Sequence, residues 1–162
     1  MTIDLKAAIK AGLIAGIVFM MLEMVLVATV GGGSPWGPPR MIAAIGMGKG
    51  VLPPPATFDL AILMVAMVIH LILAIVLGIV FALIAEAGRW NLKTSAIAGL
   101  VFGVVVYFVN FYGMSAVFPW FAMGRGMISL FAHAMFGLVL GYAYRSMTAR
   151  VVVDTREVPP AS

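Results

Sequence analysis

The chain has 162 residues, of which 64% are hydrophobic and 10% are charged, and it contains no cysteine. This composition excludes an ordinary soluble domain, in which roughly half of the residues are apolar and about a quarter are charged. It also excludes a disordered chain, which needs low hydrophobicity, and a disulfide scaffold, which needs cysteine. A formal net charge of +4 beside long apolar runs indicates membrane topology rather than a partner such as nucleic acid. We therefore expect an all-α, polytopic membrane protein in contact with the lipid bilayer.

Four segments reach the length of about 20 apolar residues that a helix needs to cross the hydrocarbon core. They predict membrane-spanning helices over residues 11–30, 60–85, 96–118 and 126–144. The Gly- and Pro-rich stretch 31–57 is the one long connection, and its middle, 41–45, is expected to form a short interfacial helix. Residues 1–150 thus form a single transmembrane domain, followed by a disordered cytoplasmic tail over residues 151–162.

The lysines and arginines predict the orientation of the spans, because cytoplasmic flanks carry the excess of these residues. One side of the predicted spans holds Lys6, Lys10, Arg89, Lys93, Arg145, Arg150 and Arg156. The other side holds only Arg40, Lys49 and Arg125. This bias predicts that both chain ends lie in the cytoplasm and that residues 31–57 face outward.

The first and third predicted spans share a pattern, and so do the second and fourth. The first span contains the letters AGLIAG and the third AGLVFG, and each has a polar residue further along, Glu23 and Asn110. The second and fourth spans contain His70 and His133, each followed by small residues at helical spacing. A Pro-Trp pair follows both the first and the third span. We interpret the chain as a four-helix bundle built from two tandem helix-pair repeats.

Each predicted helix carries one strongly polar residue on the face that also carries its small residues. Small residues four positions apart allow membrane helices to approach closely, so this face points into the bundle rather than at lipid. The helical rise places the four polar residues in the outer half of the membrane. They are Glu23, His70, Asn110 and His133. Placing an ionisable group inside a membrane costs free energy, and such residues usually serve a function. We therefore predict that these four residues form a buried polar site.

The leading hypothesis is proton- or ion-coupled handling of a small solute, in which Glu23 and the two histidines exchange protons. The second is a b-type haem held by His70 and His133, or a copper or zinc ion held by both histidines and Glu23. The third is a structural or accessory subunit of a larger membrane complex, with polar residues that only bond helix to helix. Arg40 and Arg125 either guard the outer mouth or are solvated loop charges. Four helices are few for a transporter, so transport implies a homo-oligomer.

No motif of a soluble enzyme is present. The chain has no cysteine for thiol chemistry, no phosphate-binding loop and no zinc-protease His-Glu pair on a helix. The glycine-rich stretches 31–34 and 46–50 lack the strand that a nucleotide-binding fingerprint needs, which favours flexible loops. The sequence therefore favours a non-enzymatic function.

The outer loop reads GGSPWGPPRMIAA over residues 32–44 and LPPPATFD over residues 52–59. In this string the chain resembles short four-span bacterial inner-membrane proteins that are labelled sodium:proline symporters. The resemblance covers most of the chain. It implies a location in the inner membrane of a bacterium and a function in transport, and it implies no ion ligand at any position.

Overall fold

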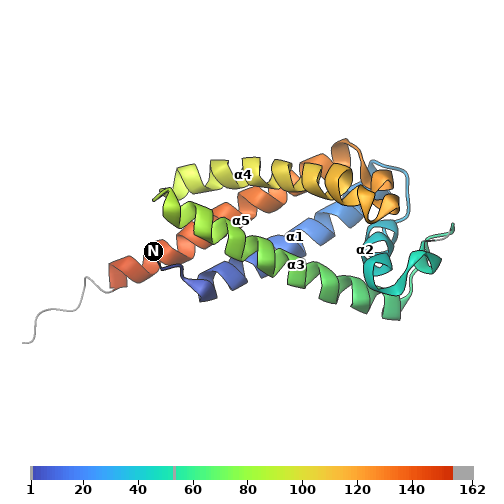
Figure 1. The fold of residues 1–162 in the computed structure, drawn as a ribbon, viewed down its shortest axis with the longest axis horizontal. Helices are drawn as coiled ribbons and strands as arrows, with labels where there is room; N and C mark the ends of the chain where they lie inside the picture. The colour runs from blue at the N-terminus through green and yellow to red at the C-terminus, as the bar shows by residue number, and fades with distance from the viewer. Residues whose placement is uncertain (1, 53, 155–162) are drawn as a thin grey trace, which may run out of the picture.

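The computed structural model describes residues 2–52 and 54–154, with residues 149–154 described as backbone alone. Within these ranges the chain is helical and has no strand, which confirms the all-α prediction. Four long helices run along the long axis of the molecule (Figure 1): α1 (Leu5–Thr29), α3 (Leu60–Ala87), α4 (Leu92–Phe108) and α5 (Met127–Asp154). The short helix α2 (Gly37–Met47) lies across one end of this bundle (Figure 1).

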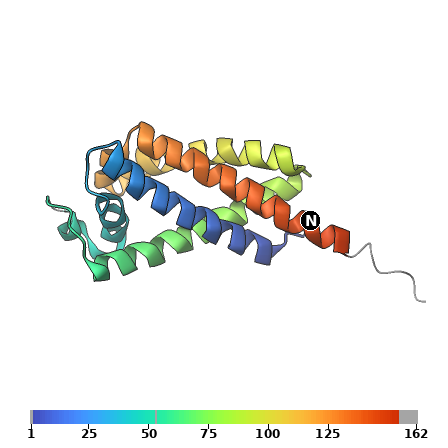
Figure 2. The same ribbon diagram turned by 180° about the vertical axis from the view of Figure 1, so that it is seen from behind.

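Short helical turns complete the connections at the end that holds α2. They are the 3-10 turn η1 (Lys49–Val51), the π-helical turn η2 (Val109–Gly113), and the 3-10 turns η3 (Met114–Ala116) and η4 (Pro119–Gly124). We call this end of the bundle the loop end. The opposite end, which we call the termini end, holds the start of α1, the turn between α3 and α4, and the last residues of α5 (Figure 2).

Three of the long helices begin at a short polar residue that caps the first turn. The side-chain oxygens of Asp4, Asp59 and Asn91 accept hydrogen bonds from the N–H groups three residues later, at 2.8, 3.0 and 2.9 Å. Such caps satisfy donors that the first helical turn leaves without partners. The predicted short helix at 41–45 is confirmed as part of α2, which has prolines in its first turn, where no donor is needed. It ends at Gly48, whose φ of 81° favours glycine.

The four long helices can each cross a membrane by length and apolar character: Leu5–Thr29, Leu60–Ala87, Leu92–Ala116 and Met127–Thr148. The chain is therefore a multi-pass membrane protein, as predicted. Residues 151–154, which we predicted to be disordered, instead continue α5, because no Gly or Pro interrupts the helix there. The rest of the predicted tail, 155–162, lies outside the described residues.

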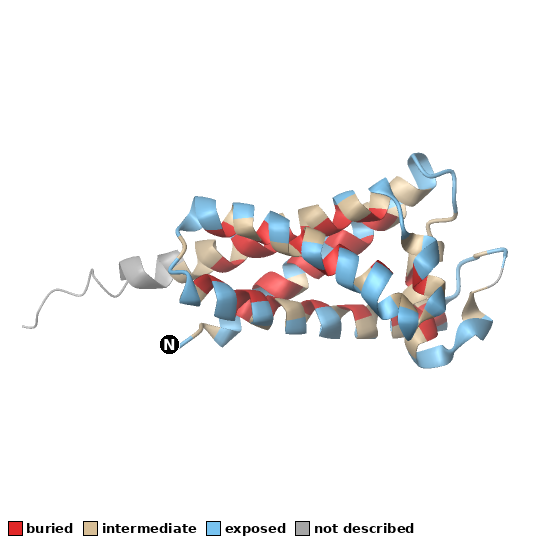
Figure 3. Cartoon of the chain, turned by 45° about the horizontal axis from the view of Figure 1, so that its top comes forward, coloured by how far each residue is buried: buried red, intermediate tan, exposed pale blue. Residues whose placement is uncertain are grey.

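The long helices pack as two pairs, α1 with α3 and α4 with α5, and α1 also lies along α5 (Figure 2). By contrast, α3 and α4 make few contacts with each other and diverge toward the loop end (Figure 1). Buried residues face the inside of the bundle, whereas the outward faces are exposed (Figure 3). The exposed side chains include Ile17, Val68 and Val101, as expected for surfaces that contact lipid.

Glycines bring α1 and α3 into backbone contact. A Cβ atom added at Gly12 would lie 2.5 Å from the carbonyl oxygen of Ala74, and one added at Gly78 would lie 2.7 Å from that of Ala8. Neither position has room for a side chain. The small residues that we predicted to face the bundle therefore lie where the two helices are closest.

The pair α4 and α5 is in backbone contact through glycines on both helices. A Cβ atom added at Gly99 would lie 3.0 Å from the carbonyl carbon of Gly137, and one added at Gly103 would lie 3.0 Å from the backbone nitrogen of Gly137. A Cβ atom added at Gly141 would lie 2.9 Å from the carbonyl carbon of Ser95. In the predicted repeat, these positions correspond to those that bring α1 and α3 together.

Candidate binding cavity

A cavity of about 760 Å³ lies between the helices in the half of the bundle nearest the loop end. Its lining reaches Ala74 and Leu77 of α3 and Phe136 of α5, while the buried Phe81 and Tyr144 lie further toward the termini end. The cavity is thus closed on that side by packed side chains. All four polar residues predicted to form a site line this cavity: Glu23, His70, Asn110 and His133.

Glu23 lies on the inner face of α1 and is only 6% exposed. The hydroxyl group of Ser129, on α5, donates a hydrogen bond to Glu23 Oε1 at 2.5 Å. Glu23 Oε2 is buried and has no hydrogen-bond partner among the described residues. Leaving a buried polar atom without a partner costs free energy, so a protein retains it where it serves a function. This oxygen can hold a proton, and in its charged form the carboxyl group brings a negative charge to the wall of the cavity.

His133 lies one helical turn after Ser129 on α5 and is bonded through both ring nitrogens. Its Nδ1 donates to the carbonyl oxygen of Ser129 at 2.7 Å, since a carbonyl can only accept. In the neutral ring, Nε2 is then an acceptor, and Asn110 Nδ2 donates to it at 3.3 Å. Ser129 therefore joins Glu23, His133 and Asn110 into one hydrogen-bonded series.

His70 lines the same cavity but is separate from this series. Its Nε2 donates to the carbonyl oxygen of Gly16 at 2.8 Å, so its Nδ1 carries the lone pair. The ring of Phe19 lies between the two histidines, with its centroid 5.4 Å from that of His70 and 4.7 Å from that of His133. The structure thus links three of the predicted residues and places the fourth behind an aromatic ring.

Asn110 belongs to the π-helical turn η2, which ends α4, whereas Glu23 lies within a regular α-helix. Arg125 holds this turn: its Nε donates to the carbonyl oxygen of Phe111 at 2.8 Å, and its guanidinium group lies 4.4 Å from the ring centroid of Tyr112. Single π-helical turns occur frequently at functional sites. Arg125 is itself exposed at the edge of the cavity.

Arg40 of α2 is buried rather than solvated, with 8% of its surface exposed. Its Nε and Nη1 atoms donate to the carbonyl oxygens of Thr57 and Val51, both at 2.9 Å. The indole N–H of Trp120 donates to the carbonyl oxygen of Met41 at 3.1 Å and so joins η4 to α2. These bonds hold the loops together where the cavity meets the loop end.

The residues of the cavity do not fit a bis-histidine haem or a bound metal ion. The Nε2 atom of His70 is bonded to a carbonyl group, and both ring nitrogens of His133 have partners. Phe19 fills the space between the two imidazoles, where a macrocycle would lie. Among the side chains of residues 2–52 and 54–148, no three His, Asp or Glu are close enough to hold a metal ion.

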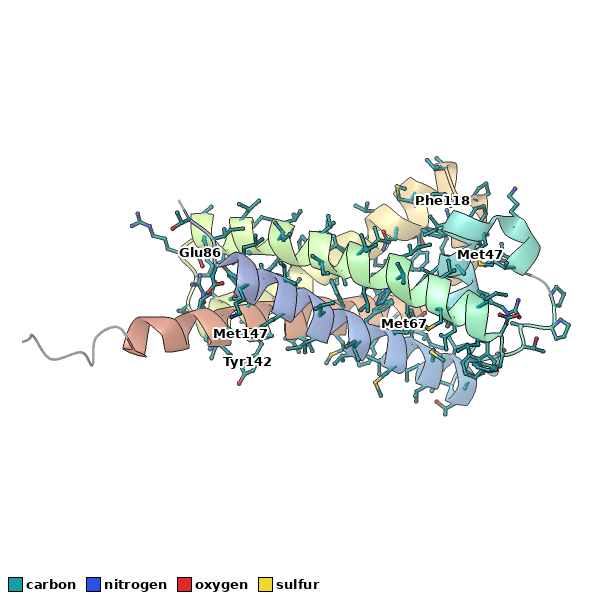
Figure 4. All side chains as sticks on the ribbon, turned by 90° about the horizontal axis from the view of Figure 1, so that it is seen from below. Met47, Met67, Glu86, Phe118, Tyr142 and Met147 are labelled. Carbon is teal, nitrogen blue, oxygen red and sulfur yellow. The ribbon has the colours of Figure 1, made fainter. Side chains whose placement is uncertain are left out.

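The termini end is held by a second polar cluster, far from the cavity. Arg145 Nη1 forms an ion pair with Glu86 Oε1 at 3.1 Å, and the hydroxyl group of Tyr144 donates to the same oxygen at 3.0 Å. Figure 4 shows Glu86 at one end of the molecule and Phe118 and Met47 at the other. The cluster bonds α3 to α5 where the bundle is closed.

Two residues of the cavity were missed from the sequence. Ser129 stands four positions before His133, a spacing that places both on one helical face and could have revealed it. The position of Phe19 beside both histidines depends on how the helices rotate against each other, and no sequence pattern predicts this rotation.

No protein-family model, curated protein or solved structure matches this chain.

Proposed function

We propose that this membrane protein binds a small solute in the cavity and couples its passage to proton exchange at Glu23. The observation that carries the proposal is the buried carboxyl group of Glu23, which lines the cavity with one oxygen held by Ser129 and the other without a partner. An ionisable residue held inside a membrane bundle is expected to serve ion or proton pathways. A carboxyl group in this setting can hold either a proton or a ligand group. Binding of the solute is thereby coupled to binding of the proton.

The packing on either side of the cavity supports the same function. Coupled transport requires a site that is open to one side of the membrane at a time. The cavity lies toward the loop end, and the opposite half is filled by buried residues such as Phe81, Leu140 and Tyr144. The Arg145–Glu86 ion pair adds a polar contact to that closed half. This arrangement corresponds to a state in which the site is closed toward the termini end.

We further propose that both chain ends are cytoplasmic, in a bacterial inner membrane. The distribution of the cations supports this orientation, because Lys6, Lys10, Arg89 and Lys93 lie at the termini end. The chain has no cysteine, so single cysteines can be introduced and labelled with a membrane-impermeant maleimide in intact cells. Lys49→Cys is expected to react and Lys93→Cys to be protected. The reverse labelling pattern would show that both chain ends lie outside the cytoplasm.

Two tandem helix-pair repeats and a homo-oligomer are also part of the proposal. The matching glycine contacts of the two helix pairs support a duplication. A second copy is expected because four helices are few for a solute pathway. Cross-linking of the purified protein in detergent, at increasing protein-to-detergent ratios, is expected to give a constant dimer band. A species that stays monomeric throughout would remove this part of the proposal.

The test of the function is solute accumulation in vesicles that contain the purified chain. The probes are tetraphenylphosphonium as a cation, benzoate as an anion and proline as a zwitterion, the last prompted by the family resemblance. With the membrane potential clamped, an imposed pH gradient is expected to drive accumulation of one probe, and Glu23→Gln should abolish it. Glu86→Gln, which removes a carboxyl group outside the cavity, is the matched control. Accumulation that is equal in the Glu23→Gln protein would overturn the proposal.

A further inference from the structure

We propose that the solute is an organic cation with an apolar body, and that it enters the cavity from the lipid side, between α3 and α4. This inference rests on the proposed function and names the substrate class of the same cavity. It follows from three properties of the cavity: the acceptor atoms at its wall, the aromatic rings that line it, and the position of its opening.

Glu23 and His70 bring acceptor atoms to the wall of the cavity. Glu23 Oε2 has no partner within the described chain, and His70 Nδ1 carries a lone pair because Nε2 donates to Gly16. The ring nitrogens of His133 are engaged by Ser129 and Asn110. A carboxylate oxygen beside a neutral imidazole acceptor is complementary to positive charge and to N–H donors.

Aromatic rings provide the second feature. The cavity is lined by Phe19, Phe111, Phe118, Phe121 and Phe136. Their faces attract cations through the ring quadrupole and also offer apolar surface to the body of the solute. A cavity of about 760 Å³ with this lining is large enough for a multi-ring organic ion.

The opening faces the hydrocarbon side of the bundle. Leu73 on α3 and Val109, the first residue of η2, both line the cavity, yet they are 47% and 53% exposed. The helices α3 and α4 diverge toward the loop end, where the cavity lies (Figure 1). They lie within the segments Leu60–Ala87 and Leu92–Ala116 that can cross a membrane. A solute that dissolves in lipid can therefore reach the cavity without crossing the loops.

The charged groups at the loop end favour this lateral route for a cation. Arg40 and Arg125 line the cavity there, and hydrogen bonds to loop carbonyl groups hold both guanidinium groups in place. Their positive charge opposes entry of a cation from the loop end. The other titratable groups that line the cavity are Glu23 on α1, His70 on α3 and His133 on α5.

The exchange at Glu23 is balanced in charge. The protonated carboxyl group releases its proton to water, and the resulting carboxylate binds the organic cation. Removal of the cation leaves the carboxylate ready to take up a proton again. Cation and proton therefore compete for one group, and each bound cation is accompanied by one released proton.

The test uses two ions of the same shape and opposite charge, tetraphenylphosphonium and tetraphenylborate. The purified full chain is titrated with each by calorimetry in buffers of different ionisation enthalpy, which reports the protons released. Tetraphenylphosphonium is expected to bind saturably with proton release, and Glu23→Gln to weaken this binding about tenfold or more, because the cation loses its counter-charge. Glu23→Asp keeps the carboxyl group and should keep the proton release.

The outcomes separate this inference from the proposed function. Tetraphenylborate that binds as tightly as tetraphenylphosphonium would overturn the cation assignment. Proton release at Glu23 with benzoate or proline, but not with tetraphenylphosphonium, would overturn the cation assignment and leave the proposed function standing. If none of these probes causes proton release that depends on Glu23, both fail.

The lateral route is tested by narrowing the opening. Val109→Trp should slow the association of tetraphenylphosphonium at least several-fold, because the indole group fills the gap between α3 and α4. Val101→Trp is the matched control, since Val101 is 56% exposed in the same span, Leu92–Ala116, and is not among the described residues that line the cavity. Equal association rates in Val109→Trp and Val101→Trp would exclude entry at this point.

Discussion

The helix pairs α1/α3 and α4/α5 both pack through small residues, but their backbones differ in how closely they approach. In α4/α5, Gly99 and Gly103 face Gly137, so backbone meets backbone along the pair. In α1/α3, the position that corresponds to Gly137 is Ala74, and the two helices make fewer contacts. The looser pair carries Glu23 and His70, whereas the tighter pair carries Ser129, His133 and the turn that holds Asn110. The comparison shows that closer backbone packing does not exclude polar residues, because both pairs contribute side chains to the cavity.

The largest expected loss of stability comes from a substitution that gives α4/α5 the alanine found at the corresponding position of α1/α3. In Gly137→Ala, the new methyl group would lie 2.7 Å from the backbone nitrogen of Gly103, so α4 and α5 must move apart. We expect a loss of about 3 kcal/mol in the free energy of unfolding, at the upper end for overpacking. Ala74→Gly, the opposite change in α1/α3, should cost less than half as much. Denaturation in mixed detergent micelles measures both, and equal losses would remove the distinction between the pairs.

The second effect compares the arginines that follow the first helix of each pair. Arg40 is buried and donates two hydrogen bonds at 2.9 Å to loop carbonyl groups, whereas Arg125 is exposed. Arg40→Lys should lower the free energy of unfolding by about 2 kcal/mol, because lysine has a single nitrogen in place of the two separate nitrogens that reach the two carbonyl groups. Arg125→Lys should lower the free energy of unfolding by less than about 1 kcal/mol. A larger loss for Arg125→Lys would mean that the π-helical turn, and not α2, anchors the loop end.

Two buried serines give the third comparison, between the open and closed halves of the bundle. In Ser129→Ala, both carboxyl oxygens of Glu23 lack a hydrogen-bond partner among the described residues. We expect the free energy of unfolding to fall by about 1.5 kcal/mol. Ser95 donates to the carbonyl oxygen of Gly141 at 2.9 Å, which is part of a helix, so Ser95→Ala should cost about 0.6 kcal/mol. Thermal unfolding of both variants in the same detergent checks the order. A smaller loss for Ser129→Ala would show that Glu23 does not need this partner.

The smallest effect is expected at the termini end. The Arg145–Glu86 pair is partly accessible, with side chains 15% and 24% exposed, and partly exposed pairs contribute little. Glu86→Gln should therefore lower the free energy of unfolding by about 0.5 kcal/mol and leave the cavity unaltered. Unfolding measured at low and high salt should show the difference shrinking as salt rises. A loss above that of Ser129→Ala would mean that the closed half depends on charge rather than on packing.

The helices and their inward faces could be predicted from the sequence, because each depends on local spacing. Runs of apolar residues gave the four spans, and the small residues at Gly12, Gly78, Gly99 and Gly141 marked the faces that meet. The short helix α2 followed from the apolar run after its prolines. These features are properties of single segments.

The geometry of the cavity could not be predicted, because it depends on how segments rotate and diverge. Helical spacing places Asn110 on the inner face, but the π-helical turn that positions it is held by Arg125 from another part of the chain. The bond from Ser129 to Glu23 joins two helices whose relative register the sequence does not state. The divergence of α3 and α4, despite the short turn that joins them, is likewise a property of the whole bundle.

Phe19 lies against both imidazole rings, and the hydrogen bond of each ring has a different structural role. The bond from His70 to the carbonyl oxygen of Gly16 crosses from α3 to α1. The bond from His133 to the carbonyl oxygen of Ser129 stays within α5, where it fixes the ring beside the serine whose hydroxyl group holds Glu23. Loss of the His70 imidazole therefore removes a tie between two helices, whereas loss of the His133 imidazole frees a backbone carbonyl group inside one helix.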